Sequence, residues 1–316
     1  MVDINLHLGK IAIVEIVITT KVQTMNIIQV FKQFPNQEAC IKHLEQKRWP
    51  QKVTCAYCGS DNTYPLANEL RHHCNGCKKS FSVTVNTIFH DTRVPLQKWF
   101  LAISLIINAK KGISARQLGR DIEVNKDTAW SMAMRIRKGM QDNGELLQGV
   151  IEMDECYIGG KPRKTGKKSD DDQNGNPRGR GTKKTPVVGM VERNGNVKAE
   201  KVSKDHLKSK DLNELIRKNV NPQESVLVTD EYRGYNKASK ILKHYRINHS
   251  FEYANGEIHT NSIESFWALI KRGIIGQFHK VSVEYLDKYL DEFTYRYNKR
   301  KEDSKDIFDS IVLNMI

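Results

Sequence analysis

Residues 150–158 read VIEMDECYI, a stretch that predicts a β-strand with three acidic side chains. Alternation along a strand puts Glu152 and Asp154 on one face and most of the apolar side chains on the other. Carboxylates in the middle of a strand are unfavourable for its formation, so something should compensate them. A bound cation would do so, and so would a nearby lysine on an exposed face. The strand by itself leaves both interpretations open.

The segments after this strand alternate between strand and helix patterns. Segments 186–192 and 197–203 flank Asn194-Gly195, which is a strong hairpin signal. The elements expected beyond the hairpin are a helix at 211–218, an apolar strand at 225–229, and helices at about 261–272 and 282–298. Strands interleaved with helices predict an α/β domain.

Two further acidic residues stand where ligands could gather. Asp230 follows the carboxyl end of the strand at 225–229, where open α/β sheets bind ligands, although it could equally cap the next helix. Glu264 lies three positions after Asn261 at a helix start. This spacing is typical of a capping box, in which Glu264 would bond back to the Asn261 amide. Lys271 lies seven residues beyond Glu264, two turns along the same helix face.

Four cysteines occur in two closely spaced pairs, each next to a glycine. They are Cys55, Cys58, Cys74 and Cys77, with two residues inside each pair and 15 between the pairs. Two such turns present the four thiolates that tetrahedral zinc needs, and they leave no open coordination position. The spacing therefore predicts a structural Zn²⁺ site, with His72 and His73 as weaker candidate ligands. Cys40 and Cys156 are expected to be ordinary buried thiols.

Residues 95–140 predict three helices joined by tight turns. Gly112 breaks the chain after the first helix, Ser114 begins a short second one, and the third runs from about 125 to 140. This arrangement suggests a helix-turn-helix, with the third helix in the position of a recognition helix. The side chains of this helix that we expect to contact DNA are Lys126, Thr128, Arg135 and Arg137. The alternative is a helical spacer with a solvated basic face.

The composition of the 316-residue chain favours a soluble protein with a polyanionic partner. Lysine and arginine total 51 against 37 acidic residues, a net charge of +14 that is spread along the chain. The most apolar stretch, at 11–19, is short and contains Glu15, so no membrane span is expected. Paired cysteines in a chain of this size indicate a reducing, cytoplasmic compartment. Residues 1–24 differ from the rest, and Met25 is a second possible start of translation.

Two other segments have a purely structural interpretation beside a functional one. The stretch 159–184 is rich in glycine, lysine and arginine, and is either a solvated loop or a clamp on the DNA backbone. Aromatic residues recur every four positions along the helix at 282–298, which predicts core packing rather than base stacking. They are Tyr285, Tyr289, Phe293 and Tyr297.

Four segments occur in an order that resembles the DDE transposases of bacterial insertion sequences. They are IEMDECYIGGK at 151–161, VTDEYRGY at 228–235, HTNSIESFWALIKR at 259–272 and YLDEFTYRYN at 289–298. The similarity is to the group with an N-terminal zinc ribbon, and with the cysteine and helical blocks it covers about residues 25–300. Several motifs in one order make the resemblance specific.

The resemblance implies an α/β fold with a ribonuclease-H-like, retroviral-integrase-like catalytic domain of mixed sheet. A small zinc ribbon and a helix-turn-helix-like domain would precede it. The expected divisions are a leader or extension at 1–24, an N-terminal helix and zinc ribbon at 25–90, a helical DNA-binding domain at 91–145, the catalytic domain at 146–300 and a C-terminal tail at 301–316.

The resemblance also implies that Asp154, Asp230 and Glu264 hold two divalent ions, either Mg²⁺ or Mn²⁺. Asn261 is the alternative third ligand, since related elements use asparagine in this motif. In such transposases water cleaves the element's ends, and the freed 3′-hydroxyls then attack target DNA. Hard carboxylate oxygens suit Mg²⁺, and two such ions can activate the attacking oxygen and stabilise the leaving one.

The expected partners follow from the same resemblance. They are the element's terminal inverted repeats and a target duplex, which Lys271 would contact near the cleaved phosphate with Arg272 beside it. Pairing two ends requires at least a homodimer, and the reaction would take place in the bacterial cytoplasm. Two other functions share these motifs. A non-catalytic zinc-ribbon and helix-turn-helix regulator would not need the three acids, whereas a hydrolytic nuclease would need them without joining strands.

Overall fold

The sheet that holds the acidic strand is built from strands far apart in the sequence. In the computed structural model its order is β6-β5-β4-β7-β8. The strands are β4 (Leu147–Ile158), β5 (Thr185–Glu192), β6 (Val197–Lys201), β7 (Val220–Thr229) and β8 (Lys243–Arg246). β5 is antiparallel to both β4 and β6, whereas β7 is parallel to β4 and β8 is parallel to β7. This mixed order is that of a ribonuclease-H-like domain, which confirms the predicted fold class.

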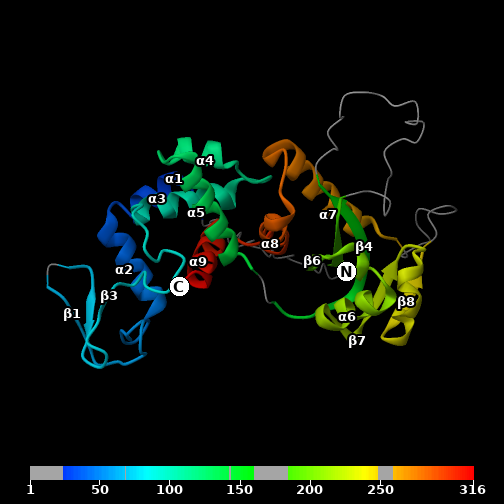
Figure 1. Ribbon diagram of the computed structural model, residues 1–316, viewed down its shortest axis with the longest axis horizontal. Helices are drawn as coiled ribbons and strands as arrows, with labels where there is room; N and C mark the ends of the chain where they lie inside the picture. Colours follow the sequence, from blue (N-terminus) through cyan, green and yellow to red (C-terminus); the bar gives the residue numbers. More distant parts are fainter. Residues whose placement is uncertain (1–23, 68, 142–143, 160–183, 248–258) are drawn as a thin grey trace, which may run out of the picture.

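The structure describes residues 24–67, 69–141, 144–159, 184–247 and 259–316. Two segments discussed above, the leader at 1–24 and the basic stretch at 159–184, therefore lie almost wholly outside the described residues. Figure 1 shows the N-terminal helices and the cysteine-rich strands at one end of the molecule, and the sheet with its covering helices at the other.

Helices cover both faces of the sheet. They are α6 (Ser209–Asn219), α7 (Asn261–Gly273) and α8 (Leu286–Asn298). On one face Leu212 of α6 belongs to the same core as Met153 of β4. On the other face α7 and α8 bury Phe266 and Phe293. The odd-numbered apolar residues of β4 face α6 and its even-numbered acids face α7, which confirms the predicted alternation. The aromatic stripe of α8 belongs to the same core, as predicted.

Short helical turns connect these elements. They are η2 (Lys204–His206), η3 (Arg233–Lys240), the π-helical η4 (Ile274–Phe278) and η5 (Val283–Tyr285). The hydroxyl of Tyr235 in η3 donates to Glu155 Oε2 at 2.6 Å, which ties the segment after β7 to β4. β7 begins at Val220 rather than at the predicted Ser225, because its first residue pairs with β4 beyond an irregularity near Gly149.

The N-terminal half and the last helix form one helical body. Its helices are α1 (Ile27–Gln33), α2 (Gln37–Arg48), α3 (Leu96–Asn108), α4 (Ala115–Asp121), α5 (Lys126–Gly139) and α9 (Ser304–Asn314). The side chains of Asn36, Ser114 and Asn125 accept hydrogen bonds from amides three residues further on, so α2, α4 and α5 start where the sequence predicted. None of the described helices is both long and apolar enough to cross a membrane.

Helix α9 corrects one predicted boundary, because residues 301–316 are not a tail. Phe308, Ile311 and Val312 are buried in the core that α2, α3 and α5 also form. The Ile88 amide donates to the Met315 carbonyl at 3.0 Å, which holds the end of the chain. The apolar stripe of α9 finds its partners far away in the sequence, so only the folded chain reveals where it packs.

A buried ion cluster joins the helical body to the sheet domain, and it corrects another prediction. Arg137 on α5 donates through Nε to Glu292 Oε2 on α8 at 2.5 Å, and its guanidinium lies 4.2 Å from the Tyr289 ring. Arg296 pairs with the second oxygen of Glu292. Although burial opposes it, the charges of Arg296 and Arg137 lower the pKa of Glu292. Arg137 is 2% exposed, so it is not a DNA contact.

The cysteine-rich strands form a small ribbon attached to α2. They are β1 (Thr63–Pro65), β2 (His72–Cys74) and β3 (Ser80–Phe81), and they pair antiparallel in this order. Arg48 at the end of α2 donates to the carbonyls of Val83 and Val85, at 2.6 and 2.7 Å. His72 Nε2 lies 2.8 Å from Glu45 Oε1, so it bonds to α2 rather than to the cysteines. The ribbon is therefore docked on the helical body by these polar contacts and by Trp49, which packs against the cores of both.

Candidate functional site

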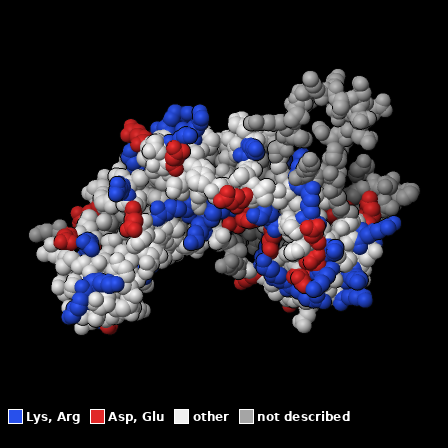
Figure 2. Space-filling model, viewed as in Figure 1, with Lys and Arg blue, Asp and Glu red and all other residues white. Residues whose placement is uncertain are grey.

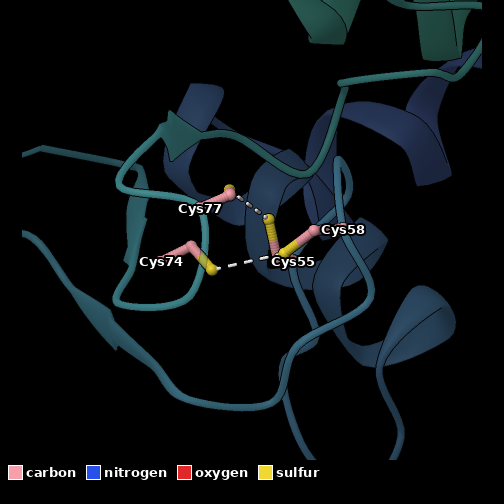
Figure 3. A group of neighbouring side chains, drawn as sticks. All are labelled: Cys55, Cys58, Cys74 and Cys77. Atoms are coloured by element: carbon pink, nitrogen blue, oxygen red, sulfur yellow. Dashed lines mark hydrogen bonds between the residues drawn. The ribbon is translucent and has the colours of Figure 1, made fainter.

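Two turns bring the four cysteines of the ribbon together, with their sulfurs directed toward one another (Figure 3). The four sulfur atoms lie within 4.8 Å of one another. The Sγ–Sγ distance is 3.7 Å between Cys55 and Cys77 and 3.6 Å between Cys58 and Cys74. A tetrahedron with Zn–S bonds of about 2.3 Å has an edge of about 3.8 Å. The predicted cysteine group is confirmed, and its donors fit structural Zn²⁺.

The thiols of the cluster differ in acidity. A hydrogen bond from the backbone of Cys77 lowers the pKa of the Cys74 thiol to about 6, against the opposing effect of burial. Although a hydrogen bond from the Ser60 backbone lowers it, burial and the neighbouring thiols raise the pKa of Cys58 to about 11. In the metal-free cluster the thiolate form that binds metals is therefore favoured at Cys74 and opposed at Cys58. Within the part of the chain that the structure describes, no other group of three or more histidine, cysteine or acidic side chains is drawn so close together.

Asp154 lies on β4, and Asp230 directly follows the last residue of the neighbouring parallel strand β7. Met153 of β4 is the register partner of Thr229 of β7, and each aspartate is the next residue along the chain. The Asp230 carboxylate also accepts a hydrogen bond from the Tyr232 amide at 3.0 Å, so it shapes the turn after β7 as well. Both interpretations of Asp230, as a site residue and as a local cap, are compatible with this geometry.

Among the predicted metal ligands, Asp154 has a shifted pKa. Burial raises its pKa to about 7, with further contributions from the charges of Glu155 and Asp230. The neutral acid is therefore favoured in this position unless a cation offsets the burial and the neighbouring charges. The donors are hard oxygens held by a rigid sheet, so they fit Mg²⁺ or Mn²⁺.

The third predicted ligand stands at the start of α7, which packs on β4. Glu264 is exposed, and its carboxylate accepts a hydrogen bond from the Thr260 hydroxyl at 3.4 Å. Asn261 is exposed one turn earlier. Among the described acids, Glu264 does not form with the two aspartates a group as close as the cysteine cluster. The choice between Glu264 and Asn261 stays a prediction.

The capping box that was the alternative interpretation of Glu264 does not form at this helix start. α7 begins at Asn261, so the N-cap position is Thr260, whose side chain caps no amide. The amides of Ser262 and Ile263 donate instead to Glu152 Oε2, at 2.7 and 3.1 Å. Sequence reasoning missed this bond because the cap comes from a strand residue 110 positions before Ser262.

A side chain of α7 also bonds to Asp154. The Trp267 indole donates to Asp154 Oδ2 at 3.0 Å. The ring lies against Gly189, the register partner of Asp154 on β5, where an added Cβ would approach the ring to 2.6 Å. Gly189 therefore allows α7 to approach the sheet closely enough for this bond. Neither residue had a signal in the sequence spacing, and both are additions to the predicted site.

Lys271 and Arg272 lie exposed in the last turn of α7. Burial raises the pKa of the Cys156 thiol on β4, and the nearby ammonium of Lys271 opposes this rise. Lys271 is thus close to the strand that carries Asp154, as its predicted role near a reacting phosphate requires. Contact of either residue with DNA stays a prediction.

Helices α4 and α5 form the tight pair expected of a helix-turn-helix. The turn between them spans residues 122–125, and Glu123 has a positive φ of 54°. Gly119 on α4 lies so close to this turn that an added Cβ would come within 2.8 Å of the Val124 carbonyl oxygen. The close approach depends on the glycine, which supports the predicted motif.

The four side chains of α5 that were predicted to contact DNA lie in different environments. Lys126 is exposed at the start of α5, beside Asp127 at 3.6 Å, and Thr128 is half-buried. Arg135 is directed inward, where it donates to the His90 carbonyl at 2.9 Å and lies over the Trp99 ring. Arg137 is buried, as described above. Lys126 keeps the exposure that a phosphate contact needs.

Two basic residues of α4 were missed by the sequence prediction. Arg116 and Arg120 line a hollow of about 400 Å³ together with Lys126. Figure 2 shows lysine and arginine side chains gathered over this part of the helical body. Their spacing of four residues places them on one face of α4, which is the signal that could have identified them.

The cysteine ribbon and the mixed sheet agree with two matched families. Residues 146–298 match a family described as "ISXO2-like transposase domain", and residues 35–80 match one described as "Transposase zinc-ribbon domain". An "Uncharacterized transposase-like protein" of Haemophilus influenzae is 33% identical over 94 residues, which are 29% of this chain and 75% of that protein. The chain therefore belongs to the insertion-sequence transposases with an N-terminal zinc ribbon.

A second relative matches along nearly its whole length. It is the "Uncharacterized protein in transposable element ISH50" of Halobacterium salinarum, which is 27% identical over 294 residues. The match covers 89% of this chain and 97% of that protein. The similarity therefore extends through the ribbon, the helical body and the sheet domain.

Two solved structures resemble this chain loosely. The Mos1 strand transfer complex is similar over 69% of this chain and 78% of that chain, with 13% identity and a TM-score of 0.27. The Mos1 mariner paired end complex with Mn is similar over 66% and 73%, with 16% identity and a TM-score of 0.30. The fold assignment depends instead on the strand order of the sheet itself.

Proposed function

We propose that this protein binds the ends of its insertion sequence and cleaves and joins DNA strands by Mg²⁺- or Mn²⁺-dependent phosphoryl transfer. Asp154, Asp230 and Glu264 hold the two ions, with Asn261 as the alternative third ligand. The observation that carries the proposal is that the pairing of Met153 with Thr229 puts the next residue of each chain segment, the half-buried Asp154 and Asp230, beside each other at one end of β4 and β7. Membership of the transposase family supports the same reaction class.

The bound ions would supply activation of the attacking oxygen and stabilisation of the leaving oxygen. The residues of the chain have other tasks. Trp267 orients one oxygen of Asp154 through its indole N–H. Lys271, near the same strand, offers positive charge to a phosphate at the site.

DNA binding is assigned to the helical body and the ribbon. Lys126, Arg116 and Arg120 contact phosphates, because these exposed cations line one hollow beside the predicted recognition helix. The net charge of +14 favours contact along a length of duplex. Two ends must be held at once, so the active form is a homodimer or a higher oligomer that acts on DNA in the cytoplasm.

The test uses the full chain, a duplex that carries the element's end, a target plasmid and Mg²⁺ or Mn²⁺. We expect cleaved ends and joined products on a sequencing gel. Asp154→Asn and Asp230→Asn should each abolish both products while end binding persists. Glu264→Gln and Asn261→Ala, compared side by side, identify the third ligand by which one loses activity. Glu214→Gln is the matched control, because Glu214 is exposed on α6, the helix on the opposite face of the sheet.

The other two functions give different results in the same assay. A regulator would bind ends but release no cleaved strand with either ion. A nuclease would nick the ends and yield no joined product. Full activity of Asp154→Asn would contradict the assignment of the metal ligands.

A further inference from the structure

Glu152 is a fully buried acid on β4, two residues before Asp154, with an exposed fraction of 0%. Its Oε2 accepts the amides of Ser262 and Ile263, and its Oε1 accepts the Ser262 hydroxyl at 3.1 Å. These amides are the second and third of α7. An N-cap side chain ordinarily accepts bonds from these positions. Glu152 therefore caps α7 from the neighbouring strand.

The charge of Glu152 is matched by groups from other elements. Arg193, in the hairpin between β5 and β6, donates through Nε to Glu152 Oε1 at 2.7 Å and through Nη2 to the His259 carbonyl at 2.8 Å. The His259 ring nitrogen Nδ1 lies 3.3 Å from the same carboxylate oxygen. A buried carboxylate paired in this way makes stronger bonds to amides than a neutral oxygen does. Its charge also suits the positive end of the helix dipole.

The capped turn is the part of α7 that carries both candidates for the third metal ligand. Asn261 precedes the two capped amides and Glu264 follows them. One turn further on, Trp267 bonds to Asp154. Two side chains on one face of β4, Glu152 and Asp154, thus hold α7 at two points. Two fixed points oppose both sliding of the helix along the strand and rotation about its own axis.

We propose that Glu152 is a positioning residue that sets the place of the third metal ligand relative to Asp154. Both of its oxygens are engaged by protein donors, so it acts through α7 rather than as a ligand. The proposal rests on the proposed function, because it requires a metal site to be positioned.

The test compares Glu152→Gln with Glu152→Ala in the full chain. Glutamine keeps the shape and one oxygen for the amides but loses the charge that pairs with Arg193, whereas alanine removes the cap. Glu200→Gln is the matched control, because Glu200 lies on β6 of the same sheet and bonds to Lys218 and Asn219 away from α7. The measurements are hydrogen exchange of peptides from 259–270, Mn²⁺ affinity by calorimetry, cleavage rate and end-DNA affinity.

We expect Glu152→Ala to accelerate exchange in the first turn of α7 and to weaken Mn²⁺ affinity and cleavage by roughly 10- to 100-fold. End-DNA affinity should be unchanged, since the helical body is untouched. Glu152→Gln should show smaller changes in the same direction, and Glu200→Gln none. If the alanine variant does not fold, the glutamine variant, which keeps the shape of the side chain, decides the question.

Several results would overturn the proposal. Wild-type Mn²⁺ affinity in Glu152→Gln, despite faster exchange, would make Glu152 a purely structural cap. Hydrogen exchange at the start of α7 that is unchanged in Glu152→Ala would show that Glu152 does not cap this helix. A wild-type chain that neither binds Mn²⁺ nor cleaves end DNA would refute the proposed function, and that failure is distinct from an active chain in which Glu152 variants match wild type.

Discussion

The cysteine cluster and the carboxylate pair gather negative side chains in opposite ways. The cysteines lie between Cys55 and Cys77, on two turns of a ribbon with short strands. Asp154 lies on β4 and Asp230 directly follows β7, in a sheet whose two faces are covered by helices. In the ribbon a cation must hold the module together, because little core is present. In the sheet the protein core holds the acids in place, and the cation of the proposed site would only offset their burial and mutual repulsion. Removing metal should therefore unfold the first site and leave the second folded.

The largest expected effect is the loss of zinc from the ribbon. Binding of structural zinc contributes on the order of 10 kcal/mol to folding of such modules. We expect Cys55→Ser, or a strong chelator, to release zinc and to unfold β1–β3 while the sheet domain stays folded. Atomic absorption reports the zinc content, and hydrogen exchange compares residues 50–85 with residues 185–230. Cys40→Ala is the control, because Cys40 is a buried thiol outside the cluster and should leave zinc in place. An ordered ribbon without zinc would erase the contrast between the two sites.

The second effect concerns Asp154, where removal of the carboxylate should increase the stability of the metal-free protein instead of lowering it. Because its pKa is raised from 3.8 to about 7, the folded metal-free protein holds this proton more tightly than the unfolded chain does. The resulting stability is present below about pH 4 and is lost as the pH rises to about 7. This shift in pKa corresponds to at most about 4 kcal/mol of the free energy of unfolding. We expect Asp154→Asn to be more stable than wild type at pH 8 without metal, as measured by urea unfolding.

Added Mg²⁺ should remove that difference by stabilising wild type and not Asp154→Asn. Asp291→Asn is the matched control, since burial raises the pKa of Asp291 to about 6 on α8, outside the proposed metal site. It should reduce the pH dependence without changing the response to Mg²⁺. Equal Mg²⁺ responses of wild type and Asp154→Asn would show that the acids are not a cation site.

The smallest effect tests how closely α7 must approach the sheet. A Cβ at Gly189 would lie 2.6 Å from the Trp267 ring, so Gly189→Ala must shift the ring and with it the bond to Asp154. Overpacking of this kind costs about 1–3 kcal/mol. Gly276→Ala is the control, because nothing lies within 4 Å of its added Cβ. We expect lower thermal stability and weaker Mn²⁺ affinity for Gly189→Ala alone. Equal behaviour of the two variants would mean that the approach of α7 does not matter to the site.

Features set by neighbouring residues were predictable from the sequence. The caps Asn36, Ser114 and Asn125 act within three residues of their own positions. The cysteine spacing and the alternation of β4 are equally local. Each depends on backbone geometry that recurs in many proteins, so the residue pattern alone identifies it.

Features that depend on a distant partner were missed or wrong. Arg137 looked like a DNA contact on a basic helix, yet its partner Glu292 is 155 positions away. Glu152 could have faced solvent or a metal, and it caps α7 instead. The apolar stripe of α9 could not be matched to a core before the fold was known.

The sequence by itself therefore determined the cysteine cluster, the faces of β4 and the order of the transposase motifs. The tertiary structure decided which acid caps α7, which arginine is buried and why Gly189 must lack a side chain. Local patterns depend on backbone periodicity and on short-range hydrogen bonds, which the residue types specify directly. The partner of a buried charge depends on which surfaces pack together when the chain folds. The spacing of residues along the sequence does not predict which surfaces these are.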